Sequence, residues 1–447
     1  MSGGWRRAFQ VERRGIEPVP ATDRHGSPGQ LFSLWWSANL GFPAWAIGVL
    51  ALALGLGLRA AVLALVLGNV VVAVLLAAAS ALGPETGVPQ LPLTRRSFGY
   101  FGTYLPALLN WLSTLGWYAV NTVLGADALA RLLGWSFLPG LLVLTVVQVV
   151  VAVFGYDAIH TVERWAAWIL AALFAGMSVV ALVRPGVGVA WTTQPFGSVG
   201  MFILTVAISA SYLFSWAPYA ADYARYLPVN AGRGRVFRAT FLGALLSTLW
   251  VELLGAAMAT LATAATPIAL LVRVLGRFSA PALVAVVLGT ITADVLNIYT
   301  GALSALTMDV PLSRAAAAVV VGLVGAVASW YGYVGFAGKY EDFLLLISYW
   351  IGPWLAVVLV DLYTRRGDFA SADLARRRPG IRLAGFVAFL AGVLASIPFM
   401  SQTLYEGPVA RALGGGDVAY WVGMVVAALV FMGLRAVTRT QAPPAGA

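Results

Sequence analysis

The 447-residue sequence contains no cysteine, only two histidines and few charged residues, which make up 10% of the chain. The lack of cysteine excludes disulfides, thiolate metal sites and cysteine nucleophiles. His25 and His160 fall in polar or charged stretches and leave little for metal binding or acid–base chemistry. Soluble domains carry about 25% charged residues. A soluble enzyme with a charged, solvated surface is therefore excluded.

Apolar residues, by contrast, make up 60% of the chain, against about 45–50% in soluble domains. Twelve membrane helices of about 20 residues each would need roughly 240 apolar positions, close to what this composition supplies. We therefore predict an all-α integral membrane protein with twelve transmembrane helices. Charged residues separate the predicted spans, which are about 31–57, 60–82, 100–126, 136–155, 164–183, 198–221, 238–263, 280–306, 315–335, 343–362, 383–402 and 418–434.

The distribution of basic residues predicts the orientation of these spans. With the N-terminus in the cytoplasm, 21 of the 28 arginines and lysines fall on the cytoplasmic side, as the positive-inside rule requires. We therefore expect a multi-pass cell-membrane protein with both termini in the cytoplasm. The net charge of +10 then needs no nucleic-acid partner.

Two predicted spans are interrupted near their middles. The first contains Asn39-Leu40-Gly41-Phe42-Pro43, and the sixth contains Ser215-Trp216-Ala217-Pro218. Paired interruptions in two inverted repeats are typical of the midplane site of a secondary transporter, although ordinary proline kinks would also produce them. The predicted segments are a cytoplasmic N-terminal segment (1–30), two inverted five-helix repeats (31–183 and 198–362), two further helices (383–434) and a cytoplasmic tail (435–447).

Two acidic residues fall near the middle of predicted spans. Glu252 lies in the seventh span and Asp294 in the eighth, and an ionisable group at that depth costs several kcal/mol unless it has a partner, a proton or a cation. Both are therefore candidates for a role in ion coupling. For Glu252, a protonated carboxyl that holds its span to a neighbouring helix explains the residue equally well.

Polar residues form one stripe in the third predicted span and another in the eighth. The stripes are Asn110, Thr114, Trp117 and Asn121, and Thr290, Asp294, Asn297 and Gly301. The offsets of 4, 7 and 11 within each stripe put its members on one helix face. Interhelical hydrogen bonds would account for either stripe alone, but two stripes together with two interrupted helices favour a binding cavity. Trp117 and Asn121 would offer a planar heterocycle both an aromatic face and an amide.

Several longer motifs occur between residues 11 and 306. They are VERRGIEPVP (11–20), WSANL (36–40), GPETG (83–87), RRSFG (95–99), LPALLN (105–110), GWYAVN (116–121), ADYARYLP (221–228) and NIY (297–299). Together these motifs resemble those of the nucleobase–cation symporter family, and specifically its purine–cytosine permease branch.

The resemblance implies a LeuT-type fold, with two inverted five-helix repeats, broken helices 1 and 6, and two additional C-terminal helices. In this family the substrate lies between helices 1, 3, 6 and 8. By position, Trp117 would stack on the substrate and Asn121 would bond to its edge. The other implied substrate contacts are Asn39, Phe214, Ser215 and Asn297. The stacking ring of span 6 stays open, since relatives carry it near Leu213, between Tyr212 and Phe214.

The resemblance also implies a cation site. Sodium-dependent members hold the ion between carbonyls of helix 1 and hydroxyls of helix 8, so that Asn39, Gly41, Thr290 and Thr292 would surround Na⁺ here. Proton coupling through Asp294 or Glu252 is the alternative, and the sequence leaves the choice open. No organic cofactor is expected.

We therefore predict a secondary active transporter, not an enzyme, that imports a nucleobase by symport with Na⁺ or H⁺ through alternating access, with cytosine or a purine as the favoured substrate. A symporter of the same fold for uracil, allantoin, hydantoin or thiamine is the first alternative, and an amino-acid symporter the second. An intramembrane enzyme is disfavoured, because it would need a nucleophile–base pair or a metal cluster that this sequence lacks. A passive channel is disfavoured because the predicted spans carry no rings of charged residues. The oligomeric state stays open.

Overall fold

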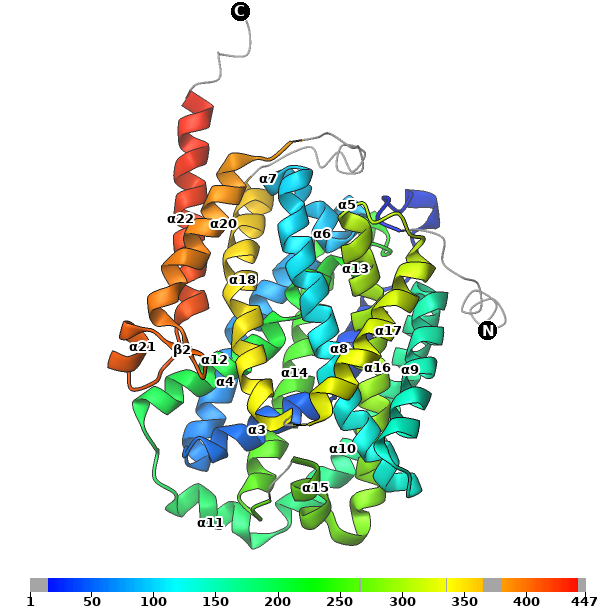
Figure 1. Cartoon of the computed structure of the whole chain (residues 1–447), viewed down its shortest axis with the longest axis vertical. Helices are drawn as coiled ribbons and strands as arrows, with labels where there is room; N and C mark the ends of the chain where they lie inside the picture. Colours follow the sequence, from blue (N-terminus) through cyan, green and yellow to red (C-terminus); the bar gives the residue numbers. More distant parts are fainter. Residues whose placement is uncertain (1–14, 265–266, 335, 365–379, 441–447) are drawn as a thin grey trace, which may run out of the picture.

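The computed structural model describes residues 15–264, 267–334, 336–364 and 380–440, and over these residues the chain is almost entirely helical (Figure 1). The first half contains η1 (Ala21–Asp23), α2 (Pro28–Asn39), α3 (Phe42–Ala53), α4 (Leu58–Ser80), α5 (Gly83–Thr86), α6 (Gln90–Leu93), α7 (Arg95–Phe98), η2 (Phe101–Thr103), α8 (Tyr104–Leu133), α9 (Phe137–Phe154), α10 (Tyr156–Leu182) and α11 (Pro185–Thr193). Residues 1–14 of the predicted N-terminal segment and 441–447 of the predicted tail lie outside the described residues.

The second half continues the helical pattern and adds a single short hairpin. Its elements are α12 (Val199–Phe214), η3 (Ala217–Tyr219), α13 (Ala220–Ala224), η4 (Val229–Ala231), α14 (Arg233–Ala259), α15 (Pro267–Leu275), η5 (Gly276–Phe278), α16 (Ser279–Thr307), α17 (Arg314–Tyr333), α18 (Phe336–Thr364), α20 (Leu383–Ser396), η6 (Ile397–Phe399), β1 (Ser401–Gln402), β2 (Tyr405–Glu406), α21 (Pro408–Ala412) and α22 (Ala419–Thr440). The two strands are antiparallel, with Ser401 opposite Glu406.

Most of the long helices have the length and composition of membrane spans. Within the described ranges, nine helices are long and apolar enough to cross a membrane, or ten when the bent pair α2 and α3 counts as one span. A shorter apolar helix covers Leu383–Phe399. The 30-residue α8, which carries one of the polar stripes, is not among these nine. The structure therefore supports a multi-pass membrane protein, and the count of twelve spans stays a prediction.

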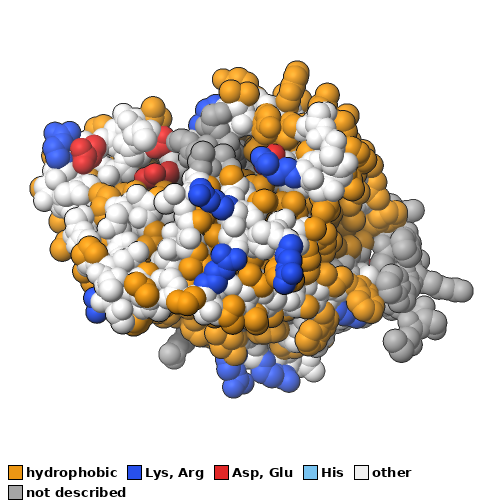
Figure 2. Space-filling view, turned by 90° about the horizontal axis from the view of Figure 1, so that it is seen from below, with side chains coloured by type: hydrophobic (Ala, Val, Ile, Leu, Met, Phe, Trp, Pro, Cys, Tyr) orange, Lys and Arg blue, Asp and Glu red, His pale blue; other side chains and the backbone are white. Residues whose placement is uncertain are grey.

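The outer surface of the helix bundle is apolar, as contact with lipid requires. Val146 on α9, Trp168 on α10 and Val327 on α17 have exposed fractions of 62%, 76% and 68%. Figure 2 shows the end of the molecule near α11 and α15, where hydrophobic side chains gather along the margin and basic side chains dot the end face. An apolar belt around polar ends is the surface of a bilayer protein.

Two helical spans are interrupted at the places where the sequence carries its helix breakers. α2 ends at Asn39 and α3 begins at Phe42, with a bend of 51° between the two helices. α12 ends at Phe214 and α13 begins at Ala220, with five residues that include the turn η3 between them. α8 and α16 pack directly against each other, since a Cβ at Gly125 would lie 2.6 Å from the Thr290 side chain. These four regions surround the site described below.

α3 and α14 approach each other so closely that their backbones are in contact. A Cβ at Gly48 would lie 1.8 Å from the carbonyl oxygen of Glu252, and a Cβ at Gly255 would lie 2.0 Å from the carbonyl oxygen of Trp45. Glycines at both sides of a helix crossing permit this approach. The second half of the broken helix 1 is therefore joined firmly to α14.

One predicted boundary is wrong in a way that bears on function. The span predicted at 164–183 is the helix Tyr156–Leu182, so His160 and Glu163 lie within a candidate membrane span and not in a loop. Both are buried, with exposed fractions of 8% and 1%. Charged residues in the first two turns of this helix lower its local hydropathy, so the hydropathy pattern placed the start of the span too late. The sequence analysis also missed the short helices α11 and α15.

Candidate functional site

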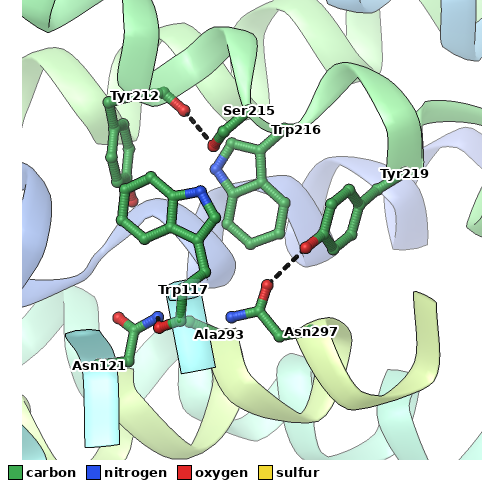
Figure 3. A pocket seen from close by; sticks show the side chains of 8 residues that line it. All are labelled: Trp117, Asn121, Tyr212, Ser215, Trp216, Tyr219, Ala293 and Asn297. Atoms are coloured by element: carbon green, nitrogen blue, oxygen red, sulfur yellow. Dashed lines mark hydrogen bonds between the residues drawn. The ribbon is translucent and has the colours of Figure 1, made fainter. Parts of the chain in front are cut away.

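A pocket lies where α8, α16 and the segment between α12 and α13 meet (Figure 3). It holds about 260 Å³ of space that no protein atom fills, part of it open to solvent. Its eight lining residues are Trp117 and Asn121 from α8; Tyr212, Ser215, Trp216 and Tyr219 from the α12–α13 segment; and Ala293 and Asn297 from α16.

The interruption after α12 puts three of these side chains in the pocket wall. The Ser215 hydroxyl donates a 2.6 Å hydrogen bond to the carbonyl oxygen of Tyr212, and Pro218 has no N–H with which to continue the α-helical pattern. The chain therefore makes a 3₁₀ turn over Ala217–Tyr219 before α13 begins. Ser215, Trp216 and Tyr219 come to lie beside α8 and α16 as a result.

Two indole rings point toward the centre of the pocket (Figure 3). The Trp117 ring is held edge-on by Tyr212 and Phe343, with centroids at 5.5 Å and 5.3 Å. The Trp216 ring makes a similar contact with Tyr219 at 5.2 Å. Neither indole Nε1 has a hydrogen-bond acceptor in the described part of the chain. Edge-on neighbours fix the plane of each indole and leave ring faces for a flat ligand.

Two carboxamides line the opposite wall, and protein contacts fix their orientation. Asn121 donates from Nδ2 to the carbonyl oxygen of Trp117 at 2.8 Å. Asn297 accepts at Oδ1 from the Tyr219 hydroxyl at 2.6 Å and donates from Nδ2 to Asp294 at 3.0 Å. A carboxamide has two donors and two acceptor positions, so each side chain keeps bonding capacity for a ligand.

Asp294 stands behind Asn297 and does not line the pocket. The carboxylate is fully buried. It accepts hydrogen bonds from Thr122 at 2.7 Å and from Gln148 at 3.1 Å, besides the bond from Asn297. Its partners come from α8, α9 and α16, so the carboxylate joins three neighbouring helices and orients the pocket amide.

The structure separates Phe214 from the other predicted substrate contacts. The Phe214 ring packs against Tyr420 and Trp421 of α22, with centroids at 5.5 Å and 6.1 Å, and it does not line the pocket. The pocket rings of this segment are instead Tyr212, Trp216 and Tyr219. Their spacing of four and three residues is that of one helix face. This spacing is visible in the sequence and could have predicted these three rings as pocket residues.

Asn39 and Gly41 lie at the break of helix 1, next to the pocket but not in its wall. Asn39 donates from Nδ2 to the Trp35 carbonyl at 2.8 Å, and its buried Oδ1 has no partner in the described residues. A Cβ at Gly41 would lie 3.9 Å from the hydroxyl of Tyr212, which lines the pocket. Asn39 is thus placed to shape the break, and it is not among the residues that line the pocket.

The two threonines expected to hold a cation face different neighbours. The Thr290 hydroxyl donates to the carbonyl oxygen of Asn121 on α8 at 3.2 Å. Thr292 donates to the carbonyl of Gly289 at 2.9 Å, and a Cβ on Gly289 would lie 2.9 Å from the carbonyl oxygen of Leu40 at the break. Thr292 therefore lies one turn of α16 beyond Gly289, the residue that contacts the break of helix 1. The Thr290 hydroxyl instead bonds to α8.

Glu252 belongs to a separate buried cluster. Its Oε2 accepts hydrogen bonds from Asn69 at 2.6 Å and from Ser209 at 3.0 Å, which joins α14 to α4 and α12. The carboxyl is fully buried and its residue does not line the pocket. This geometry agrees with the structural alternative for Glu252, in which the carboxyl holds neighbouring helices together.

Comparison with known proteins identifies the family. The family model described as "Permease for cytosine/purines, uracil, thiamine, allantoin" matches residues 18–423. The chain belongs to this permease family. It is 32% identical to a putative purine–cytosine permease of Bacillus subtilis, over 95% of each chain. It is also 32% identical to a purine–cytosine permease of Emericella nidulans, over 96% of this chain and 89% of the relative.

The fold of the permease is also similar to that of a solved transporter. Mhp1, a nucleobase-cation-symport-1 family transporter solved in a closed conformation with bromovinylhydantoin bound, superposes with a TM-score of 0.80 at 18% identity, over 96% of each chain. The likeness to Mhp1 shows a shared fold, whereas the family model and the two permease relatives confirm the predicted family membership. The family consists of permeases, which also confirms the prediction of a transporter over an enzyme.

Proposed function

We propose that this permease imports a nucleobase, with cytosine or a purine as the favoured substrate, in symport with a cation. The observation that carries the proposal is the pocket wall of two indoles and two carboxamides. Aromatic faces stack on the flat ring of a base, and carboxamides bond to the donors and acceptors of its edge. The names of the two permease relatives support the same substrate class.

The pocket also disfavours an amino-acid substrate. None of its eight lining residues is acidic, basic or histidine, so a zwitterionic amino acid would find no countercharge in this wall. Burial of an unpaired charge is costly. The amino-acid symporter is therefore the weaker candidate. The family description names uracil, thiamine and allantoin besides cytosine and purines, and these heterocycles, together with hydantoins, form the alternative substrate class.

Transport would proceed by alternating access between two inverted repeats, residues 31–183 and 198–362. In this proposal twelve helices cross the cell membrane and both chain ends face the cytoplasm. The bend of 51° between α2 and α3 supports a hinge in helix 1, and the interruption after α12 would supply the matching hinge in helix 6. Substrate would favour the closed state, because only in that state would it contact both broken helices as well as α8 and α16.

The driving ion would be Na⁺ or H⁺. For Na⁺, the carbonyl groups around Asn39–Gly41 and the hydroxyl of Thr292 are the nearest oxygen ligands to the break, whereas Thr290 would have to give up its bond to α8. Oxygen ligands are what a hard cation requires. For H⁺, a buried carboxyl would bind the ion.

Uptake measurements test this function directly. Cells that lack their own nucleobase carriers would express the permease and receive labelled cytosine, adenine, uracil, allantoin, hydantoin, thiamine or an amino acid. We expect saturable, ion-driven accumulation of cytosine or a purine above the external concentration. Absence of uptake for every heterocycle would refute the proposal, and equilibration without accumulation would indicate a passive channel.

A further inference from the structure

One buried carboxyl bonds directly to the first half of the broken helix 1. Glu163 on α10 is 1% exposed, and the hydroxyl of Ser37 on α2 donates a hydrogen bond to its Oε2. Ser37 lies two residues before the end of α2. The other oxygen of the carboxyl, Oε1, has no partner within the described ranges. Among the described residues the carboxyl thus has a single bond, and that bond crosses from α10 to α2, the first half of the interrupted helix 1.

The surroundings of Glu163 provide no countercharge. Helices α10, α2, α9, α11, α14, α15 and α16 pack together here, and α2, α9 and α11 contain no ionisable side chain. On α10 itself, Asp157 pairs with His25 at 3.1 Å, and Arg164 is exposed. The ionisable residues of the remaining three helices are Arg233, Arg235, Arg238, Glu252, Arg273, Arg277 beyond α15, Asp294 and Tyr299.

None of those groups forms a bond with the Glu163 carboxyl. Arg233 pairs with Glu85, and Arg235, Arg238 and Arg273 donate to backbone carbonyls. An ionised carboxylate at this depth without a cation would cost several kcal/mol. A bound proton removes the charge of the carboxyl. It also allows the acid to donate a hydrogen bond to Ser37 Oγ, so that the single hydroxyl proton of Ser37 can serve the 2.8 Å bond to the Ser33 carbonyl oxygen.

We propose that Glu163 is the proton-binding site that couples substrate import to the proton gradient, and that its bond to Ser37 breaks when α2 moves away from α10. This inference rests on the proposed function and identifies the driving ion as H⁺. In this proposal the carboxyl takes up one proton from the outer side while the pocket is open to that side, and it holds this proton while α2 is packed on α10. When α2 departs, water reaches the carboxyl, the acid ionises as exposed carboxylic acids do at neutral pH, and the proton leaves toward the end of α10 at Tyr156.

Two further residues of α10 lie between Glu163 and that end of the helix. His160 is one turn from Glu163, and its buried Nε2 has no partner in the described part of the molecule. Asp157 is one turn further and carries the partly buried pair with His25. The three positions follow one another at intervals of three residues, so they share one side of the helix. This line of groups gives the released proton a route to water.

The other buried carboxyls of the candidate sites are less suited to this coupling. Within the described residues, Asp294 bonds to residues of α8, α9 and α16, and Glu252 bonds to residues of α4 and α12. Neither is bonded to α2. A group whose contacts stay together through the cycle does not sense the opening of the site, whereas the bond of Glu163 does.

Proteoliposomes with an imposed pH gradient test the proposal. One proton per substrate converts a gradient of one pH unit into a roughly tenfold accumulation of labelled cytosine. We expect the wild-type permease to approach this ratio. Glu163→Gln should equilibrate at a ratio of about one, because the glutamine amide can bond to Ser37 but does not take up or release a proton. Cytosine counterflow, which needs no net proton movement, should persist in Glu163→Gln. Glu406→Gln, the same substitution on the exposed β2 strand, is the matched control and should accumulate cytosine as the wild type does.

The possible results separate the two levels of the argument. Absence of both counterflow and uptake in the wild-type permease for all tested bases would refute the proposed function. Wild-type accumulation by Glu163→Gln would refute the proton site, as would loss of accumulation in Glu252→Gln with retention in Glu163→Gln. If Glu163→Gln does not fold, Ser37→Ala provides the test, since it removes the one bonding partner that the carboxyl has among the described residues. The pH dependence of cytosine binding to detergent-solubilised Ser37→Ala should then differ from the wild type, and an unchanged profile would refute the proposal.

Discussion

Trp117 provides the most direct test of the binding pocket. Its indole is 5% exposed and is oriented by Tyr212 and Phe343, so its ring plane is fixed before the substrate arrives. Removal of an aromatic ring that stacks on a base costs about 1–3 kcal/mol. Trp117→Ala should therefore raise the Kd for cytosine by about 5- to 150-fold, since 1.4 kcal/mol corresponds to tenfold in affinity.

The assay would measure equilibrium binding of labelled cytosine to purified permease in detergent. Because a buried tryptophan also supports the fold, the thermal unfolding temperature of Trp117→Ala is recorded beside its Kd. Trp117→Phe retains an aromatic face and should recover part of the affinity. Trp135→Ala is the matched control, because Trp135 follows α8 directly but is 45% exposed and does not line the pocket. A wild-type Kd in folded Trp117→Ala would remove Trp117 from the site.

Three further substitutions test the contacts around the pocket. Tyr219→Phe removes the donor to Asn297 and should weaken cytosine binding by about 2- to 10-fold, the range for one neutral hydrogen bond; an unchanged Kd would show that this bond does not orient the amide. Asp294→Asn should weaken binding by about 2- to 10-fold, because the new amide disturbs the bond that Asn297 donates to Asp294 and one neutral hydrogen bond contributes about 0.5–1.5 kcal/mol, while proton-driven accumulation persists; loss of proton dependence would instead make Asp294 the coupling group. Gly48→Ala should lower the thermal unfolding temperature strongly, because its Cβ would meet the Glu252 carbonyl oxygen at 1.8 Å, whereas Gly176→Ala meets nothing within 4 Å and should not; equal unfolding temperatures would contradict the close contact.

Regular periodicity made part of the site predictable from sequence. Trp117 and Asn121 lie on one unbroken helix, and Asn297 lies on another, so their spacing alone placed them on faces that could meet. A proline three residues after Ser215 marked the interruption in the sequence, and the family resemblance assigned Ser215 itself to the site. The structure brings these four residues to one pocket, and their contact with a substrate stays a prediction.

Other parts of the site depended on geometry that the sequence does not carry. Phe214 was chosen by alignment next to a helix end, where a shift of one residue turns a side chain by about 100°, and its ring lies against α22 instead. Glu163 was missed because the charges at the start of α10 resemble a loop. The partners of Glu252 come from two other helices, and only the fold brings them to the same place.

The backbone contact between α3 and α14 determines where helix 1 can flex. Gly48 of α3 and Gly255 of α14 lie at this contact, and no side chain or lipid chain fits between the two helices. Rotation of α3 about its own axis would bring the Cβ atoms of residues next to Gly48 into the α14 backbone. α3 and α14 are therefore packed too closely to slide or rotate past each other. The first half of helix 1 also meets α14 closely, since a Cβ at Gly243 would lie 2.7 Å from the carbonyl oxygen of Phe32. A change in the 51° bend at Leu40–Gly41 must therefore be accompanied by a shift in one of these two contacts with α14.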